Sequence, residues 1–248
     1  MSSAPGGDYV TRHVTTLVLT GARFFVLLAA LACGGSAAKP SAADISPAPT
    51  TVLAPPGQLA RFAALKVMVL PAQSVQADSL PAWRNTATVG KALLAALDSA
   101  VEGALNQRGM QTMWVYPAAL QRSARRNPTY LTDPYLMQAL DPVRQALKKP
   151  QDALSEPFAS QLRALAGVND SRYSLIPLVL RFEPSVITAQ GQGQAQGQAR
   201  AVLRSVVVDA RGAQVVWVGE VASEPQAAFS AAILASLAQR VADLVVPR

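Results

Sequence analysis

Apolar and polar residues follow two patterns along this chain, one typical of buried strands and one typical of amphipathic helices. Residues 62–70 are an apolar run that ends before a proline, as expected for a strand covered on both faces, and residues 110–116 predict a second strand that ends before Pro117. A polar loop is expected over residues 72–85. After it, a helix capped by Thr86 or Thr88 and ended by Gly109 is predicted from the helical spacing of Val89, Leu93, Leu97, Val101 and Leu105.

The middle of the chain has the least regular pattern. Residues 118–126 predict a short helix, and the dipeptides Asn127-Pro128, Asp133-Pro134 and Asp141-Pro142 predict turns. A second helix is predicted from Ser155 to Gly167, with Pro157 in its first turn. We therefore expect an irregular, proline-rich insert around residues 117–155.

The last third of the chain predicts three strands and a helix. Residues 173–182 form a strand that Pro177 places at a sheet edge or a bulge, because proline has no N–H to donate. Residues 199–209 and 213–222 form a hairpin, and residues 227–246 form the closing helix. The element order predicts an α/β (α+β) fold, with one mixed β-sheet and helices packed on it, in a single domain of residues 59–248.

The N-terminus has the pattern of an export signal. Residues 24–32 are nine consecutive apolar residues, preceded by Arg12, His13 and Arg23 and followed by Cys33. Such an order is typical of a signal peptide, here residues 1–32, cut between Ala32 and Cys33. An uncleaved membrane anchor is disfavoured, because Arg23 near its middle would cost roughly 2.5–3.5 kcal/mol. An ordinary secretory signal, with Cys33 incidental, is the other alternative.

The segment around the cleavage position also resembles a bacterial lipobox, in the residues Ala30, Leu31, Ala32 and Cys33. That resemblance implies cleavage before Cys33 and lipidation of its thiol. Gly34 follows, where an aspartate would favour retention in the inner membrane, so an outer-membrane lipoprotein facing the periplasm is expected. Residues 33–58 are rich in proline, alanine and serine and predict a disordered tether, since they bury too little apolar surface to offset the entropy of ordering.

The rarest residues restrict the chemistry of the mature chain. The sequence has one cysteine, Cys33, and one histidine, His13, which a cut before Cys33 would remove. Cys/His zinc sites, Ser–His–Asp triads and Cys–His pairs are then excluded. We expect no enzyme activity, no metal and no cofactor. Asp98 and Glu102 lie one helical turn apart and are interpreted as solvated rather than as a hydrolase pair.

The net charge is +7, with the basic residues scattered along the chain. Basic and aromatic residues that bracket the irregular insert could contact an envelope protein partner or an anionic polymer, and the alternative is a solvated loop. Nucleic acid is disfavoured by the export signal. The candidate contact residues, including one tryptophan in the polar loop, are Trp83, Arg122, Arg125, Arg126, Tyr130, Tyr135, Lys148 and Lys149.

Several short sequence motifs resemble those of the CsgG/LpoB-like and TolB-N-terminal-like domains of bacterial envelope proteins. Residues 66–71 are similar to their first strand, and Arg108-Gly109 is similar to the end of their first helix. Residues 167–170 resemble a Gly-x-Asp phrase that enters the next strand. Residues 209–217 resemble a hairpin turn, although Gly212 stands one place earlier than the glycine usual there.

The resemblance implies three roles in different members. LpoB-like members are tethered activators of peptidoglycan synthases, TolB uses the domain for interactions, and CsgG-like members form outer-membrane pores. A pore needs lipid-facing strands of about 9–11 residues, and the only candidate, residues 189–198, offers nothing larger than alanine to lipid. We expect a lipid-anchored, non-enzymatic protein–protein interaction module, accessory to cell-wall synthesis or envelope assembly. An oligomeric CsgG-like secretion subunit is the alternative.

Overall fold

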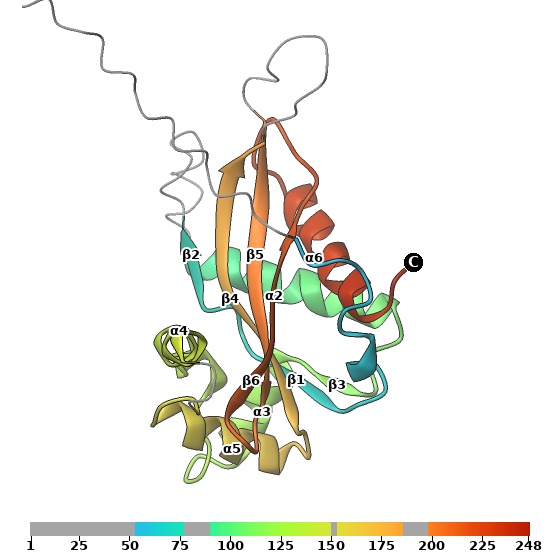
Figure 1. Cartoon of the computed structure of the whole chain (residues 1–248). Coiled ribbons are helices and arrows are strands. Elements are labelled where there is room, and N and C mark those ends of the chain that lie inside the picture. The colour runs from blue at the N-terminus through green and yellow to red at the C-terminus, as the bar shows by residue number, and fades with distance from the viewer. Residues whose placement is uncertain (1–52, 77–89, 150–152, 186–197) are drawn as a thin grey trace, which may run out of the picture. The chain divides into compact units, whose positions relative to one another are not determined.

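The computed structural model describes residues 53–76, 90–149, 153–185 and 198–248, all within one compact unit of residues 48–248 (Figure 1). Among the described residues the strands are β1 (Val67–Val69), β2 (Ser74–Gln76), β3 (Trp114–Val115), β4 (Tyr173–Pro184), β5 (Ala199–Asp209) and β6 (Gln214–Ala222). The helices are α2 (Gly90–Gln107), α3 (Pro117–Arg126), α4 (Leu140–Lys148), α5 (Phe158–Val168) and α6 (Ala231–Val245), with 3-10 turns η1 (Ala60–Phe62) and η3 (Pro134–Leu136).

The strands form one mixed sheet. Its order is β3-β1-β4-β5-β6, and β2 pairs with β4 beyond the end of β1. β1 lies parallel to β3 and to β4, whereas β4, β5 and β6 are antiparallel. Helices pack on this sheet, so the predicted α+β fold class is confirmed.

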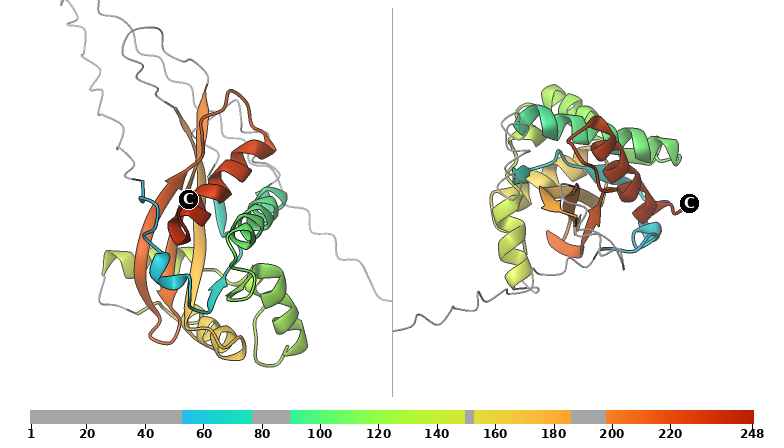
Figure 2. Two further views of the ribbon diagram at one scale, coloured as in Figure 1. Left: turned by 90° about the vertical axis from the view of Figure 1, so that its right-hand side faces the viewer. Right: turned by 90° about the horizontal axis from the view of Figure 1, so that it is seen from above.

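One face of the sheet is covered by α2 and α6, which lie side by side (Figures 1 and 2). Both helices are amphipathic, and the apolar side chains that recur every three or four residues face the sheet. Their core partners from the strands include Val67, Leu175, Phe182, Leu203 and Val207. This layer is the larger of the two hydrophobic cores.

The opposite face is covered over part of its length by α3, α4 and α5. Side chains of alternate strand residues, such as Met68, Ile176 and Val206, pack here against Leu120, Val143 and Leu162 of these helices. Farther along this face Val179 is partly exposed and Arg204 is exposed, whereas Val202 is buried. We call this part of the face, which lies beyond the core residues Ile176 and Val206, the open half of the sheet.

Pro177 lies at a bulge in a central strand, so the predicted bulge is confirmed and the alternative of an edge strand is wrong. The register of β4 against β5 shifts between Pro177 and Val179. On its other side, β4 pairs with β1 up to Leu175 and with β2 from Val179 onward. Pro177, which has no backbone N–H to donate, thus lies where the neighbour of β4 changes from β1 to β2. Its carbonyl still accepts a hydrogen bond from the Gln73 backbone N–H at 3.0 Å.

The insert around residues 117–155 is more regular than the sequence indicated. The predicted short helix is present as α3, but Asp133 and Asp141 start η3 and the first turn of α4 rather than open turns. Asp133 accepts a hydrogen bond from the Tyr135 backbone N–H, and Pro142 occupies the first turn of α4, where its missing N–H costs no helical hydrogen bond. The insert therefore places one additional helix, α4, beside the open half of the sheet.

The other element limits differ from the expected ones by a few residues. The first strand covers only Val67–Val69, because Phe62 belongs to η1, and a short strand, β2, lies inside the expected polar loop. The expected strand at residues 110–116 is reduced to β3, while the later helix, hairpin and closing helix are confirmed as α5, β5–β6 and α6. The capping residues Thr86 and Thr88 and most of residues 189–198 lie outside the described residues.

Residues 53–58, which precede the expected boundary at residue 59, contact the domain. The Ala54 N–H donates to the Glu220 carbonyl of β6 at 2.7 Å, and the Gly57 N–H donates to the Asp243 carbonyl of α6 at 2.9 Å. Gln58 accepts a hydrogen bond from the Trp217 indole at 3.0 Å. The last six residues of the expected tether, 53–58, are therefore packed on the domain, and the signal segment and the rest of the tether lie outside the described residues.

Candidate functional site

The residues predicted to contact a partner fall on two different helices. Arg122, Arg125 and Arg126 are exposed on α3, and Lys148 and Lys149 are exposed at the end of α4. Tyr130 is 79% exposed and Tyr135 is 46% exposed, near η3. Of this set only Lys148 lines either of the two pockets considered below. Trp83, Cys33 and Ala32 lie outside the described residues.

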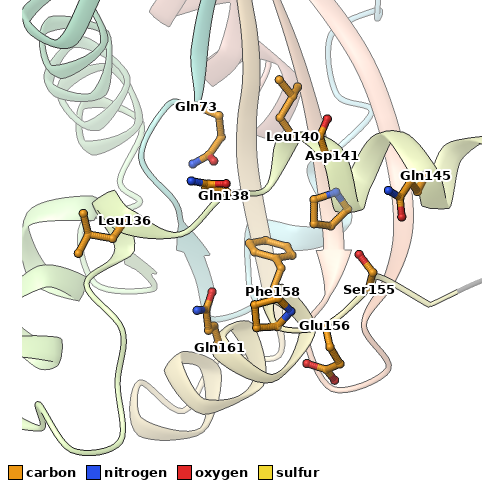
Figure 3. Close-up of a pocket in the computed structure, with 12 residues that line it drawn as sticks. Gln73, Leu136, Gln138, Leu140, Asp141, Gln145, Ser155, Glu156, Phe158 and Gln161 are labelled. Carbon is orange, nitrogen blue, oxygen red and sulfur yellow. The ribbon is translucent and has the colours of Figure 1, made fainter. Parts of the chain in front are cut away.

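A cavity of about 550 Å³ lies between α4, α5 and the segment after β1, and we call it the amide pocket (Figure 3). It is formed where the N-terminal ends of α4 and α5 approach each other. Its lining residues are Gln73, Leu136, Gln138, Leu140, Asp141, Pro142, Gln145, Ser155, Glu156, Pro157, Phe158 and Gln161. Four of them are glutamines and none is cationic.

Two of the polar groups in the amide pocket have structural partners. The Gln73 side chain donates to the Pro71 carbonyl at 2.8 Å and accepts from the Ala139 N–H at 2.9 Å, which joins the end of β1 to the start of α4. Glu156 accepts a hydrogen bond from the Ser160 N–H and pairs with Arg163. The hydrogen bonds from Ser160 hold the pKa of Glu156 below its usual range. Glu156 is therefore an ionised cap of α5.

The remaining amides are available to a ligand. Gln138, Gln145 and Gln161 have no side-chain hydrogen bond to another described residue, and the apolar wall is formed by Leu136 and Phe158. An amide side chain both donates and accepts hydrogen bonds. With two carboxylates and no cation among its lining residues, the amide pocket is suited to a neutral polar ligand and unsuited to an anion.

A second cavity, of about 380 Å³, lies on the other side of α4, against the open half of the sheet. We call it the cationic pocket. Its lining residues are Gln76 of β2, Leu178, Val179 and Arg181 of β4, Arg204 of β5, and Leu140, Arg144, Leu147 and Lys148 of α4. It has four basic side chains and no acidic one, so the two sides of α4 have opposite electrostatic character.

Asp98 is buried, contrary to the expectation that it is solvated. Its Oδ1 accepts a hydrogen bond from the Ala72 N–H at 2.9 Å, and its Oδ2 has no hydrogen-bond partner among the described residues. Burial, with a smaller contribution from the charge of Glu102, raises its pKa from 3.8 to about 6. The Tyr116 hydroxyl is also buried and has no hydrogen-bond partner among the described residues, and burial raises its pKa. The Asp98 carboxyl fixes the segment after β1, which carries Gln73 into the amide pocket.

Sequence reasoning missed most residues of both pockets. The glutamines carry no distinctive spacing, and Arg181 and Arg204 lie far apart in sequence and meet only through strand pairing. The one available signal was the spacing of Arg144 and Lys148, which places both on one side of a helix. Within a proline-rich segment expected to be irregular, this spacing alone does not indicate a helix.

The described residues contain no group of three or more histidine, cysteine, aspartate or glutamate side chains placed to hold a metal ion. No helix within the described ranges is both long enough and apolar enough to cross a bilayer.

The sequence matches no protein-family model, and it has no significant match among curated proteins. Solved structures give loose superpositions. The LpoB C-terminal domain from Escherichia coli is 14% identical with a TM-score of 0.28, over 63% of this chain and 81% of that one. Lipoprotein GNA1162 from Neisseria meningitidis is 13% identical with a TM-score of 0.29, over 71% and 94%.

A PelC dodecamer from Paraburkholderia phytofirmans gives a TM-score of 0.32 at 12% identity, covering 79% of this chain and 94% of that one. The likeness concerns the fold alone.

Proposed function

We propose that this chain is a lipid-anchored protein of the bacterial outer membrane, facing the periplasm, whose domain binds a partner protein and catalyses no reaction. The observation that carries the proposal is Cys33, the only thiol of the chain, directly after nine apolar residues. The absence of histidine after Cys33 supports a role without nucleophilic or acid–base catalysis of the usual kinds. Because short sequence motifs of the chain resemble LpoB-like domains, we propose that it serves cell-wall synthesis or envelope assembly.

The structure supports a binding role through the position of α4. This helix is held by the buried side chains of Val143 and Ala146, while its remaining faces line two cavities of opposite character. A pocket with an apolar wall and a few polar groups is the usual form of a binding site. We therefore place the partner contact around α4 rather than on the arginines of α3.

Lipidation is tested by feeding cells radiolabelled palmitate and expressing the full chain. We expect the wild type to incorporate label and to sediment with membranes, and Cys33→Ser to do neither. Ser36→Ala, three positions away, is the matched control and should behave as the wild type. Equal processing of the wild type and Cys33→Ser, without label in either, would exclude the lipid anchor.

The partner contact is tested separately with a photo-cross-linking side chain placed in the full chain in intact cells. A probe at Gln145, which lines the amide pocket, should give a discrete cross-linked band. A probe at Lys91, exposed on α2 on the opposite side of the sheet, is the control and should give none. Bands of equal strength at both positions would contradict a specific contact around α4.

A further inference from the structure

We infer that the cationic pocket is the docking site for an acidic peptide segment of a partner protein, with a leucine-like side chain flanked by carboxylates. The inference deepens the proposed function, because it names the chemistry of the partner, and it rests on the proposed binding role. It is carried by the combination of uncompensated positive charge and an apolar floor in one cavity between α4 and the sheet.

The positive charge comes from two elements that face each other across the cavity. Arg144 and Lys148 lie one turn apart on α4, and Arg204 lies opposite them on β5. Lys148 and Arg204 have no ion pair with another described residue. Arg144 has one with Asp141 at 3.2 Å, in which both side chains are more than half exposed. Such an exposed pair is weak and can be exchanged for a ligand carboxylate.

Two acidic side chains, Glu183 and Glu220, pair with Arg181 of the cavity wall. Glu220 of β6 accepts two hydrogen bonds from the Arg181 guanidinium, at 3.0 and 2.7 Å, and Glu183 accepts a third at 2.7 Å. Glu183 also pairs with Arg200 at 3.3 Å. These bonds hold Arg181 as a rigid part of the wall, and they leave Glu183 and Glu220 committed to arginines other than Arg204.

The apolar floor decides what kind of anion fits. Leu140 and Leu147 of α4 and Leu178 and Val179 of β4 line the same cavity as the cations. A phosphate or sulfate ion would make no use of these side chains. At about 380 Å³ the cavity is at the small end of ligand pockets and holds one or two side chains rather than a folded surface or a long acyl chain. A short peptide with one apolar anchor and flanking carboxylates satisfies both the charge and the floor.

The test is titration of the purified full chain with a fluorescein-labelled peptide, Glu-Asp-Leu-Leu-Glu-Glu, followed by fluorescence anisotropy. The matched probe, Gln-Asn-Leu-Leu-Gln-Gln, keeps the shape and removes the charge. We expect the acidic peptide to bind about tenfold or more tightly than the neutral one, and its affinity to fall as salt is raised. Lys148→Glu combined with Arg204→Glu should weaken it by a similar factor.

Two controls make the outcome specific. Arg122→Glu combined with Arg125→Glu reverses the same number of charges on α3 and should leave binding within about twofold of the wild type. Lys-Lys-Leu-Leu-Lys-Lys should bind the Lys148→Glu, Arg204→Glu protein better than the wild type, which shows that the variant remains folded.

The inference would be overturned if the acidic peptide did not bind. It would also be overturned if the Arg122→Glu, Arg125→Glu protein lost as much affinity for the peptide as the Lys148→Glu, Arg204→Glu protein. Binding of phosphatidylglycerol vesicles in place of the peptide, lost in the Lys148→Glu, Arg204→Glu protein, would assign the pocket to lipid and overturn it too. Palmitate labelling and cross-linking at Gln145 do not depend on these cations, so the proposed function and this inference fail separately.

Discussion

The carboxyl of Asp98 joins α2 to the segment that follows β1, and its burial makes the stability of the domain depend on pH. The side chain is 8% exposed and receives one hydrogen bond, from the Ala72 N–H. Its pKa is raised from 3.8 to about 6, mainly by burial, so the folded state binds the proton more tightly than the unfolded chain. The stabilising contribution is complete below about pH 4 and is lost as the pH rises through about 6.

Asp98→Asn should remove this pH dependence. Asparagine keeps an acceptor oxygen for the Ala72 N–H but cannot ionise, so the variant gains stability relative to the wild type as the pH rises. From about pH 4 to about pH 7 we expect the difference in unfolding free energy to change by up to about 3 kcal/mol, measured by urea unfolding. Asp141→Asn is the control at an exposed carboxylate. Parallel pH curves for the wild type and Asp98→Asn would contradict the argument.

The candidate site could be predicted from sequence only in part. The prediction that basic residues around the insert form a contact surface identified Lys148, which lines the cationic pocket, but not Arg144 or Arg204. Arg204 reaches the pocket because β5 pairs with β4 in a register that places it opposite Val179. A single sequence without strand register does not give that pairing. The proposed role of Lys148 in binding stays a prediction.

The elements that the sequence predicted correctly are the long ones, in which the hydrophobic pattern repeats several times. The helices α2 and α6 and the long hairpin of β5 and β6 carry a clear helical or alternating pattern. The strand β2 has three residues and was hidden in a polar stretch, since so short a segment has no measurable period. The helix α4 was missed because Asp141-Pro142 starts a helix as readily as a turn, and only the buried Val143 and Ala146 distinguish the two.

The C-terminal ends of α2 and α6 are joined by Arg108, which follows α2 directly. Its guanidinium donates to Asp243 at 2.5 Å and to the carbonyl of Val246, which follows the last residue of α6. Both charged side chains are largely buried, at 12% and 15% exposure. A largely buried carboxylate is destabilising unless a cation pairs with it. Besides Arg108, the Arg248 side chain lies 4.0 Å from the Asp243 carboxylate.

Arg108→Met should therefore lower the unfolding free energy by about 2 kcal/mol, because it leaves Asp243 without its close partner and one carbonyl unbonded. Combining it with Asp243→Leu should cost no more than the single change, since no unpaired charge remains. Urea unfolding measures both, and Arg125→Met on the exposed side of α3 is the control. A loss below about 0.5 kcal/mol for Arg108→Met would show that the pair is not stabilising.

At the scale of the whole molecule, the segment before η1 contacts one edge of the sheet. β6 is an edge strand, and an open edge exposes unpaired backbone groups that promote association. Ala54 pairs with this edge at Glu220, and Gln58 holds the Trp217 indole. The Trp217 ring lies directly over Gly219, so close that a Cβ there would overlap the ring. The edge, the ring and the incoming chain therefore form one packed unit.

This arrangement predicts different stabilities for two shortened chains. A chain that starts at residue 48 keeps the contacts of Ala54, Gly57 and Gln58, whereas one that starts at residue 59 loses the three hydrogen bonds that these residues form with β6 and α6. At about 1 kcal/mol for each bond, the shorter chain should be less stable by about 2–3 kcal/mol, measured by urea unfolding. Its Trp217 fluorescence should shift to longer wavelength as the ring gains solvent. It should also self-associate at concentrations where the longer chain stays monomeric, because its sheet edge is open. Equal stability and equal emission of the two chains would show that the folded domain begins at residue 59 and that residues 53–58 do not stabilise it.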